Sequence, residues 1–205
     1  MEKSRFIITD LRQGIKNPNR VNVFVDEKYT FSLDVAQIVD FGVKVGQELS
    51  EDELEEFKKV SEFGKLYQRA LEWTLMRPRS EKEVRDYLNK KIYEKKLNKD
   101  YIEDIIGRLK DKKYVDDVKF AEWYVENRFI KKGISRKRLS MELMKKGIAR
   151  GVIEDVLNGR DDETELRKMI AKKQTRYTDE KLMAYLVRQG FSYDLVKKVL
   201  AENND

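Results

Sequence analysis

The stretch Ser135-Arg-Lys-Arg-Leu-Ser-Met-Glu-Leu-Met-Lys-Lys-Gly-Ile148 contains a pattern that occurs three times in the chain. The pattern is a serine or threonine that is followed, four and eight residues later, by aliphatic residues. Its three copies are Ser80, Val84 and Leu88, then Ser135, Leu139 and Leu143, then Thr178, Leu182 and Leu186. Residues four apart share one face of a helix, and serine or threonine favours a helix start. The sequence therefore predicts three capped helices, each with one apolar face.

A hexapeptide with a shared apolar pattern follows each copy, at 101–106, 152–157 and 195–200. A unit that recurs every 45–55 residues or so indicates a duplicated element whose neighbours complete each other's cores. We therefore expect a mainly α fold of three tandem three-helix repeats, at 62–114, 115–160 and 161–205, forming an elongated array. Gly147 and Gly190 are expected to end the second helix of their repeats. The first copy has an insertion near Ile92–Asn98 in place of the glycine.

The first 49 residues differ from the rest because β-branched and aromatic residues dominate short segments near 5–9, 20–25 and 28–33. The last two segments alternate around a turn at Asp26-Glu27, which is typical of a hairpin. We expect a small β-rich domain at 1–49, built on a three-stranded meander, with a helix that ends at Gly42. Ser50 and Glu53 form a capping box at the start of a linking helix at 50–61.

Composition favours several small cores over one large core. Of 205 residues, 40% are charged, and the mean hydropathy is −0.74. The net charge is +6, but residues 128–150 contain nine basic residues and one acid, a local balance of +8. The rest of the chain is close to neutral. We therefore expect a binding partner of this protein to contact the basic segment.

The chain contains no cysteine and no histidine. Disulfides, typical zinc sites and thiol or Ser–His nucleophiles are thereby excluded, and we expect no catalytic residues, no metal and no cofactor. The paired acids Asp116-Asp117 and Asp161-Asp162 are better explained as caps of helix starts than as magnesium ligands. No secretion signal and no apolar stretch of about 18 residues is present, which predicts a cytoplasmic protein that does not bind membranes.

The basic segment spans three predicted helix termini. Clustered cations repel each other, and phosphate groups are their commonest neutralising partner. The alternative is a solvated face without a partner. Lys137, Arg138 and Lys145 are predicted on the face of their helix opposite Leu139 and Leu143. The candidate residues for binding DNA or a nucleoprotein filament are Arg128, Lys131, Lys132, Arg136, Lys137, Arg138, Lys145, Lys146 and Arg150.

The aromatic residues Phe120, Trp123 and Tyr124 recur at helical spacing. Such a pattern is more typical of a helix core than of a base-stacking surface. We therefore predict that these three side chains pack inside the second repeat.

Two adjacent segments closely resemble the central motif of the RecX family, regulatory proteins that restrain the RecA recombinase. They are Tyr114-Val-Asp-Asp-Val-Lys-Phe-Ala-Glu-Trp-Tyr-Val-Glu-Asn-Arg128 and Lys132-Gly-Ile-Ser-Arg-Lys-Arg-Leu-Ser-Met-Glu-Leu-Met-Lys-Lys-Gly-Ile148. Residues 79–84 and 186–196 resemble the family's first and third units. The N-terminal segments 25–33 and 42–49 are similar to those of its longer members.

The resemblance implies a non-enzymatic regulator that lies in the groove of a RecA filament on single-stranded DNA. From the repeat pattern and composition we expect the chain to be a monomer. It would inhibit filament growth, strand exchange and filament-stimulated cleavage, and so act in recombination, repair and the SOS response. Binding to duplex DNA through phosphates is a further expectation. The family motif supports Arg128, Lys132 and Lys146 best among the candidate residues, with Gly147 beside them. Lys131 and Lys137 are candidates from charge alone.

Two other functions fit parts of the pattern. A general DNA-binding protein or helix-turn-helix transcription factor would use Ser135–Gly147 as its recognition helix, although no seam for a dimer is present. A metal-dependent nuclease would need carboxylates that converge on a sheet. The N-terminal acids Asp10, Asp26 and Asp34 are scattered at predicted turns and strand ends, which disfavours the nuclease.

Overall fold

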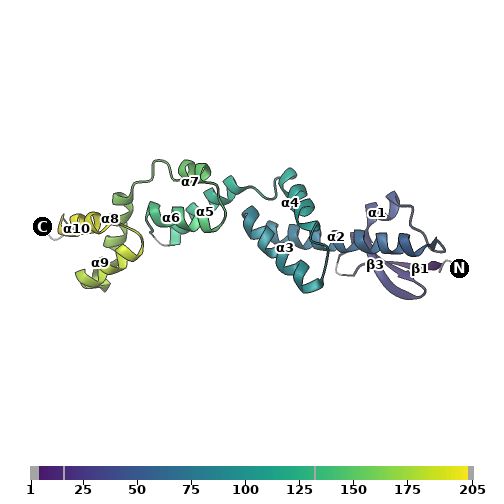
Figure 1. The fold of residues 1–205 in the computed structure, drawn as a ribbon. Helices are drawn as coiled ribbons and strands as arrows, with labels where there is room; N and C mark the ends of the chain where they lie inside the picture. The colour runs from purple at the N-terminus through teal and green to yellow at the C-terminus, as the bar shows by residue number, and fades with distance from the viewer. Residues whose placement is uncertain (1–4, 16, 132, 203–205) are drawn as a thin grey trace. The chain divides into compact units, whose positions relative to one another are not determined.

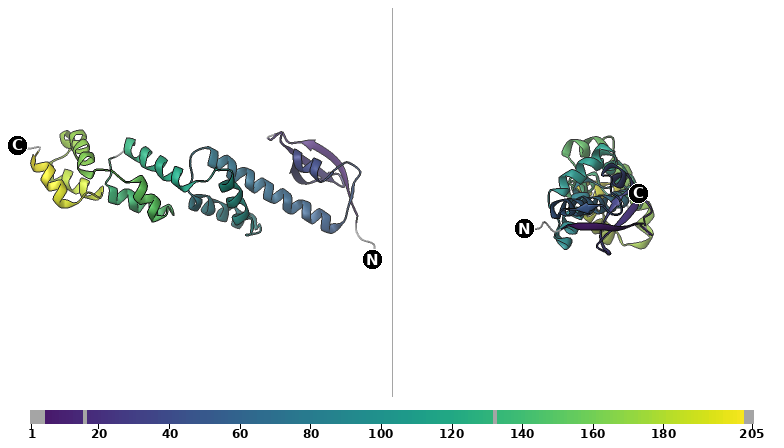
Figure 2. Two further views of the ribbon diagram at one scale, coloured as in Figure 1. Left: turned by 90° about the horizontal axis from the view of Figure 1, so that it is seen from above. Right: turned by 90° about the vertical axis from the view of Figure 1, so that its right-hand side faces the viewer.

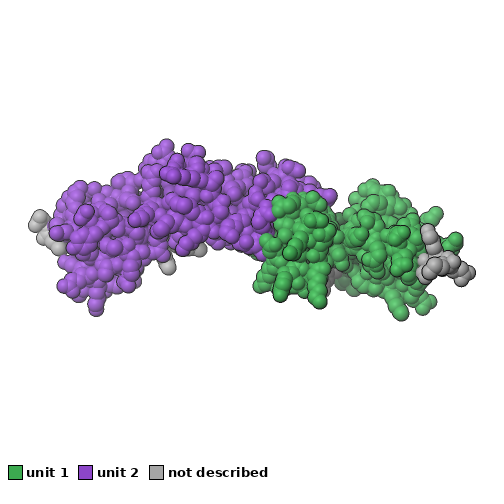
Figure 3. Space-filling model, viewed as in Figure 1, with its two compact units in different colours: residues 1–73, 88–105 green, residues 74–87, 106–205 purple. Residues whose placement is uncertain are grey.

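The computed structural model describes residues 5–15, 17–131 and 133–202, and only the backbone of residues 129–131. A small sheet is followed by helices, which confirms the predicted mainly α fold with a β-rich N-terminal part (Figure 1). The chain divides into two compact units, the first formed by residues 1–73 and 88–105 and the second by residues 74–87 and 106–205 (Figure 3). The finer boundaries at 49, 61, 114 and 160 stay a prediction.

The sheet contains one strand more than the sequence predicts. β1 (Phe6–Gln13), β2 (Arg20–Val25) and β3 (Lys28–Asp34) form the expected meander, and β4 (Glu48–Leu49) adds to β1 in the order β3-β2-β1-β4. All three pairings are antiparallel. The turn between β2 and β3 lies at Asp26 and Glu27 as predicted, and both residues have positive φ, 48° and 67°.

β4 escaped prediction because two residues are too few to show an alternating pattern. Its place is fixed by pairing with β1, which lies about forty residues earlier in the chain. Phe6 pairs with Leu49, and the Ile8 amide donates to the Gln47 carbonyl at 2.9 Å. The three-stranded meander is therefore corrected to a four-stranded sheet.

Two helices accompany the sheet. α1 (Val35–Asp40) ends at Gly42, which has φ +61°, as the sequence predicts. α2 (Glu51–Leu75) is one continuous helix (Figure 2), and its capping box is present. The Ser50 amide donates to Glu53 at 2.8 Å, and the Glu53 amide donates to the Ser50 hydroxyl at 3.3 Å. Leu54 of α2 is buried in the core beneath the sheet.

The remaining helices follow the predicted repeats. They are α3 (Glu81–Lys95), α4 (Tyr101–Asp111), α5 (Asp117–Lys131), α6 (Arg136–Lys145), α7 (Arg150–Val156), α8 (Asp162–Lys173), the 3-10 turn η1 (Gln174–Arg176), α9 (Asp179–Arg188) and α10 (Tyr193–Glu202). All six aliphatic residues of the repeated pattern are fully buried, in α3, α6 and α9. The hexapeptides lie in α4, at the end of α7 and in α10, and most of their aliphatic residues are buried, whereas Val152, Val156 and Leu195 are partly buried.

The C-terminal ends of α3, α6 and α9 show how the repeats differ. Gly147 and Gly190 have φ of +83° and +93° and end α6 and α9, as predicted. In the first copy, Ile92 stands at the position of these glycines and is buried inside a longer helix. Lys96 there takes the positive φ, 55°, and the Leu97 amide donates to the Ile92 carbonyl at 3.1 Å. The insertion is therefore an added turn of α3.

The second and third repeats each contain a core of their own. Phe120, Leu139 and Leu143 belong to the core of the second repeat, and Trp123 and Tyr124 pack against it. The predicted packing role of the three aromatic residues is thus confirmed. Leu166, Leu182 and Val196 belong to the corresponding core of the third repeat.

Candidate functional site

The helix α6, which carries most of the basic segment, begins and ends as its sequence dictates. The Ser135 hydroxyl accepts a hydrogen bond from the Arg138 amide at 3.1 Å, so Ser135 is the N-cap. At the other end, Gly147 allows the Ile148 amide to reach the Leu143 carbonyl at 3.2 Å. Leu139 and Leu143 face the core, which leaves the opposite face of α6 for other contacts.

The N-terminus of α6 packs against the third repeat. We call this contact the joint, and it is formed by Ser135, Arg136, Asp162, Gln189 and Gly190. Ser135 is fully buried, and its amide donates to the Gln189 carbonyl at 3.2 Å. The Arg136 amide donates to the Asp162 carboxylate at 2.7 Å. Gly190 completes the joint, because a Cβ at its position would overlap the Ser135 hydroxyl.

The same joint is found one repeat earlier, at the N-terminus of α3. The Glu81 amide donates to the Asp117 carboxylate at 2.8 Å, and a Cβ on Gly147 would lie 2.7 Å from the Lys82 Cβ. Asp117 and Asp162 therefore join successive repeats, which corrects their predicted role as caps of their own helices. The preceding acids, Asp116 and Asp161, do cap α5 and α8.

A groove with a volume of about 570 Å³ lies beside the joint between the second and third repeats. Its cationic lining comes from Lys137, Arg138 and Lys145 of α6 and from Arg188 at the end of α9. The exposed apolar residues Met141 and Val187 also line it, and Glu142, Gly190, Phe191 and Ser192 complete it. Cationic and exposed apolar side chains thus line the same groove.

Arg188 is a groove residue that the sequence reasoning missed. It follows Thr178 by ten residues, as Lys145 follows Ser135, so the threefold register could have identified it. The candidate residues are chosen by local charge density, which is high only in the basic segment. An isolated arginine in the third repeat is therefore left out of the candidate set.

Arg138 is half-buried and tied to three groups, which corrects its predicted place on an exposed face. Its guanidinium donates to the Arg188 carbonyl at 2.6 Å and to the Gln189 side chain at 3.2 Å. It also lies 3.4 Å from the Glu142 carboxylate. Arg138 therefore holds the joint together and forms one wall of the groove.

Glu142 is the single acid of the basic segment. It pairs with Arg128 as well as with Arg138. The Arg128 guanidinium pairs with it at 2.8 Å, and the Tyr124 hydroxyl donates to it at 2.9 Å. Arg128 also lies over the Tyr124 ring, 5.6 Å from its centre. These contacts lie within one repeat, so much of the Arg128 charge is already compensated.

The other predicted residues fall into three groups. Lys146 pairs with Glu83 of α3 at 2.6 Å, and Arg150, which is 88% exposed, pairs with Glu154 at 2.8 Å. Arg136, Lys137 and Lys145 are exposed, and within the described part of the chain their side chains have no hydrogen-bond or ion-pair partner. The Lys131 side chain and Lys132 lie outside the described residues. The structure thus gathers Lys137 and Lys145 with Arg188 as partnerless cations.

Glu142 makes stability depend on pH at the acid end. Burial raises the pKa of Glu142, but the Tyr124 hydroxyl and the guanidinium groups of Arg128 and Arg138 outweigh it, and the net pKa is lowered. A lowered pKa contributes stability above the pKa of the unfolded chain, and this stability is lost as the pH falls through the folded pKa. We expect Glu142→Gln to lower the free energy of unfolding at neutral pH and to have a shrinking effect below about pH 4, the region of unperturbed carboxyl groups. Urea unfolding of both proteins across this range measures the difference, and a difference independent of pH would contradict the prediction.

Over the ranges 5–15, 17–131 and 133–202, no group of three acidic side chains is arranged to hold a metal ion. No described helix is long and apolar enough to cross a membrane. The features present are cationic and apolar side chains on a repeat scaffold. Fold and site together define a helical-repeat protein with a small β-rich N-terminal part and a basic groove between two repeats.

Comparison with known proteins agrees with this class. The model of the regulatory protein RecX N-terminal domain matches residues 6–50, and that of the RecX second three-helix domain matches residues 116–157. The regulatory protein RecX of Bacillus pumilus is 35% identical over 97% of this chain and 78% of its own length. That of Listeria welshimeri is 32% identical over 95% of this chain and 75% of its own. The chain belongs to the RecX family of regulatory proteins.

Solved structures share the fold. A crystal structure of a regulatory protein RecX superposes with a TM-score of 0.68 at 22% identity, over 94% of this chain and 97% of the other. The crystal structure of RecX from Lactobacillus salivarius gives a TM-score of 0.52 at 28% identity, over 68% of this chain and 95% of the other. The fold is therefore shared with the first structure over nearly the whole chain and with the second over about two thirds of it.

Proposed function

We propose that this chain is a non-enzymatic regulator of the RecA recombinase that binds the RecA filament on single-stranded DNA. It acts as a monomer in the cytoplasm and inhibits filament growth, strand exchange and filament-stimulated cleavage. The groove between the second and third repeats, with Lys137, Lys145 and Arg188, contacts DNA phosphates. Membership of the RecX family supports the recombinase as partner.

One observation carries the assignment of the groove. Lys137, Lys145 and Arg188 come from two different repeats and line one groove, and none has an acidic partner among the described residues. Like charges that are held together without counterions attract a polyanion, because released counterions and phosphate contacts relieve their repulsion. Met141 and Val187 add apolar surface suited to unpaired bases or to the filament protein.

The environment of α6 disfavours a helix-turn-helix reader of base edges. Recognition helices present their N-terminal residues to the major groove. In α6 the backbone at that end is engaged in the joint, since Ser135 is fully buried and the Arg136 amide is bonded to Asp162. The Arg138 side chain is also engaged there, which leaves only the side chains of Arg136 and Lys137 exposed. A general DNA-binding protein remains the second candidate, because the same groove would serve any phosphate backbone.

Reversing the two exposed lysines of the groove should weaken binding without unfolding the chain. Lys137→Glu/Lys145→Glu removes two phosphate contacts, and each is expected to lower the salt slope of single-stranded DNA binding by about 0.7. We expect an affinity at least about tenfold lower, measured by fluorescence anisotropy over a salt series. Arg138 is unsuitable for this test because its reversal would also break the joint.

The matched control is Lys181→Glu/Lys197→Glu, which reverses two exposed lysines of the third repeat outside the groove. It changes the net charge equally and should leave most of the affinity intact. If the groove variant folds normally and still inhibits RecA-driven strand exchange at the wild-type concentration, the groove is not the working surface. Equal losses in both variants would indicate a response to net charge alone.

A titration of the protein into a RecA ATPase assay on single-stranded DNA separates the two candidate functions. A RecA regulator should inhibit the assay well below the concentration that coats naked DNA. A general DNA-binding protein would inhibit only as it covers the strand.

A further inference from the structure

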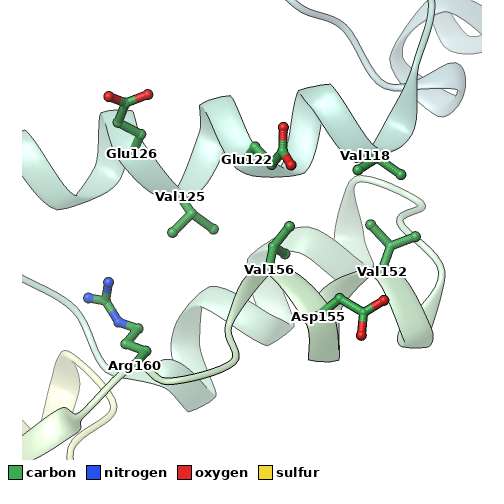
Figure 4. Close-up of a pocket in the computed structure, with 8 residues that line it drawn as sticks. All are labelled: Val118, Glu122, Val125, Glu126, Val152, Asp155, Val156 and Arg160. Carbon is green, nitrogen blue, oxygen red and sulfur yellow. The ribbon is translucent and has the colours of Figure 1, made fainter.

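A second groove, of opposite charge, lies within the second repeat between α5 and α7. Its volume is about 580 Å³. Val118 and Val125 line it from α5, and Val152 and Val156 line it from α7, so that the facing surfaces are apolar (Figure 4). Val118 is 45% exposed, and the other three are partly buried beside the core. An open aliphatic strip of this kind favours contact with another apolar surface.

Three carboxylates border this strip. They belong to Glu122 and Glu126 of α5 and to Asp155 of α7 (Figure 4). Among the described residues, none of the three side chains has a hydrogen bond or an ion pair. Some other acids of the same compact unit do have cationic partners, as Glu154 has Arg150 and Glu163 has Arg167. The rim of the groove is therefore uncompensated negative charge in a chain of net charge +6.

Arg160, at one end of the groove, does not neutralise the rim. Its guanidinium donates to the Ile134 carbonyl at 2.9 Å and lies 3.9 Å from the Glu165 carboxylate. Its side chain is only 10% exposed. The lining thus has a charge of −2, with the one cation already engaged by groups outside the groove.

We propose that this groove binds a polypeptide segment of the recombinase filament that presents aliphatic side chains flanked by lysine or arginine. The inference rests on the proposed function and adds a protein contact to it. The acidic rim repels phosphate, so the nucleic acid of the filament is excluded as the occupant. Cationic side chains on the partner satisfy Glu122, Glu126 and Asp155, and its aliphatic side chains cover the valines. Two grooves of opposite charge then divide filament recognition between DNA and protein.

The test reverses the rim charge on α5. Glu122→Lys/Glu126→Lys changes two exposed residues, and we expect its affinity for a RecA filament on single-stranded DNA to fall about tenfold or more relative to its affinity for naked DNA. The matched control, Glu56→Lys/Glu180→Lys, has the same net charge and reverses two exposed carboxylates outside the groove, which also have no ion-pair partner among the described residues. Fluorescence anisotropy of labelled protein, with filament and with naked DNA, gives both affinities.

The apolar part of the groove is tested separately with Val118→Ser. This side chain is exposed, so its replacement uncovers no core, and the variant should bind naked DNA normally but the filament more weakly. An unchanged ratio of filament to DNA affinity in both groove variants would overturn the inference alone. A wild-type protein with no preference for filament over naked DNA would overturn the proposed function as well. Self-association of the wild type that the rim variant abolishes would assign the groove to a second copy instead.

Discussion

Replacing Leu143 with alanine should lower the free energy of unfolding by about 2–5 kcal/mol, the range for buried leucines. Leu143 is fully buried in the core of the second repeat and occupies the register position of Leu88 and Leu186. Its carbonyl also accepts the Ile148 amide that closes the end of α6. The cavity left by the missing side chain adds to the lost burial in setting this cost. Urea unfolding followed by circular dichroism measures it.

Met144→Ala is the control for this change, because Met144 follows Leu143 on the same helix and is 54% exposed. Its loss removes little buried surface and should cost well under about 1 kcal/mol. A comparable loss in the two variants would show that α6 does not bury the face that the repeat register predicts.

Replacing Gly190 with alanine should destabilise the joint between the second and third repeats by about 2–5 kcal/mol. Two effects add. Gly190 has φ +93°, which an L-residue adopts only with strain, and its Cβ would overlap the Ser135 hydroxyl and lie 2.9 Å from the Arg138 Cβ. Ser135 and Arg138 are fixed by the cap and by the joint, so neither can move away freely. Hydrogen exchange of the α9 amides and urea unfolding report the loss.

Gly159→Ala separates the two effects. Gly159 also has a positive φ, 72°, but no atom lies within 4 Å of a Cβ built there. Only the backbone strain remains, and the expected cost is about 1–2 kcal/mol. Because the basic groove lies beside the joint, Gly190→Ala should also weaken DNA binding, whereas Gly159→Ala should leave it unchanged. Equal effects of the two substitutions would show that close packing at Gly190 is not what the joint requires.

The sequence by itself determined the features that depend on near neighbours in the chain. A residue four positions from another lies on the same face of a helix whatever the rest of the protein does, so Leu139 and Leu143 could be placed in a core at once. The caps at Ser50 and Ser135, the helix ends at Gly147 and Gly190, and the hairpin turn follow for the same reason. The family resemblance rests on these positions and on the residues between them.

Only the tertiary structure decided which side chains of different elements meet. Asp162 bonds to Arg136 and Arg138 to Gln189 across 26 and 51 residues, and no local pattern encodes such a pairing. A local count of charge treats all cations of residues 128–150 alike. Packing of the third repeat against α6 separates them, since it engages Arg138, leaves Lys137 and Lys145 open and brings Arg188 beside them. The acid-rimmed groove likewise arises because α5 and α7, which are separate in sequence, pack side by side.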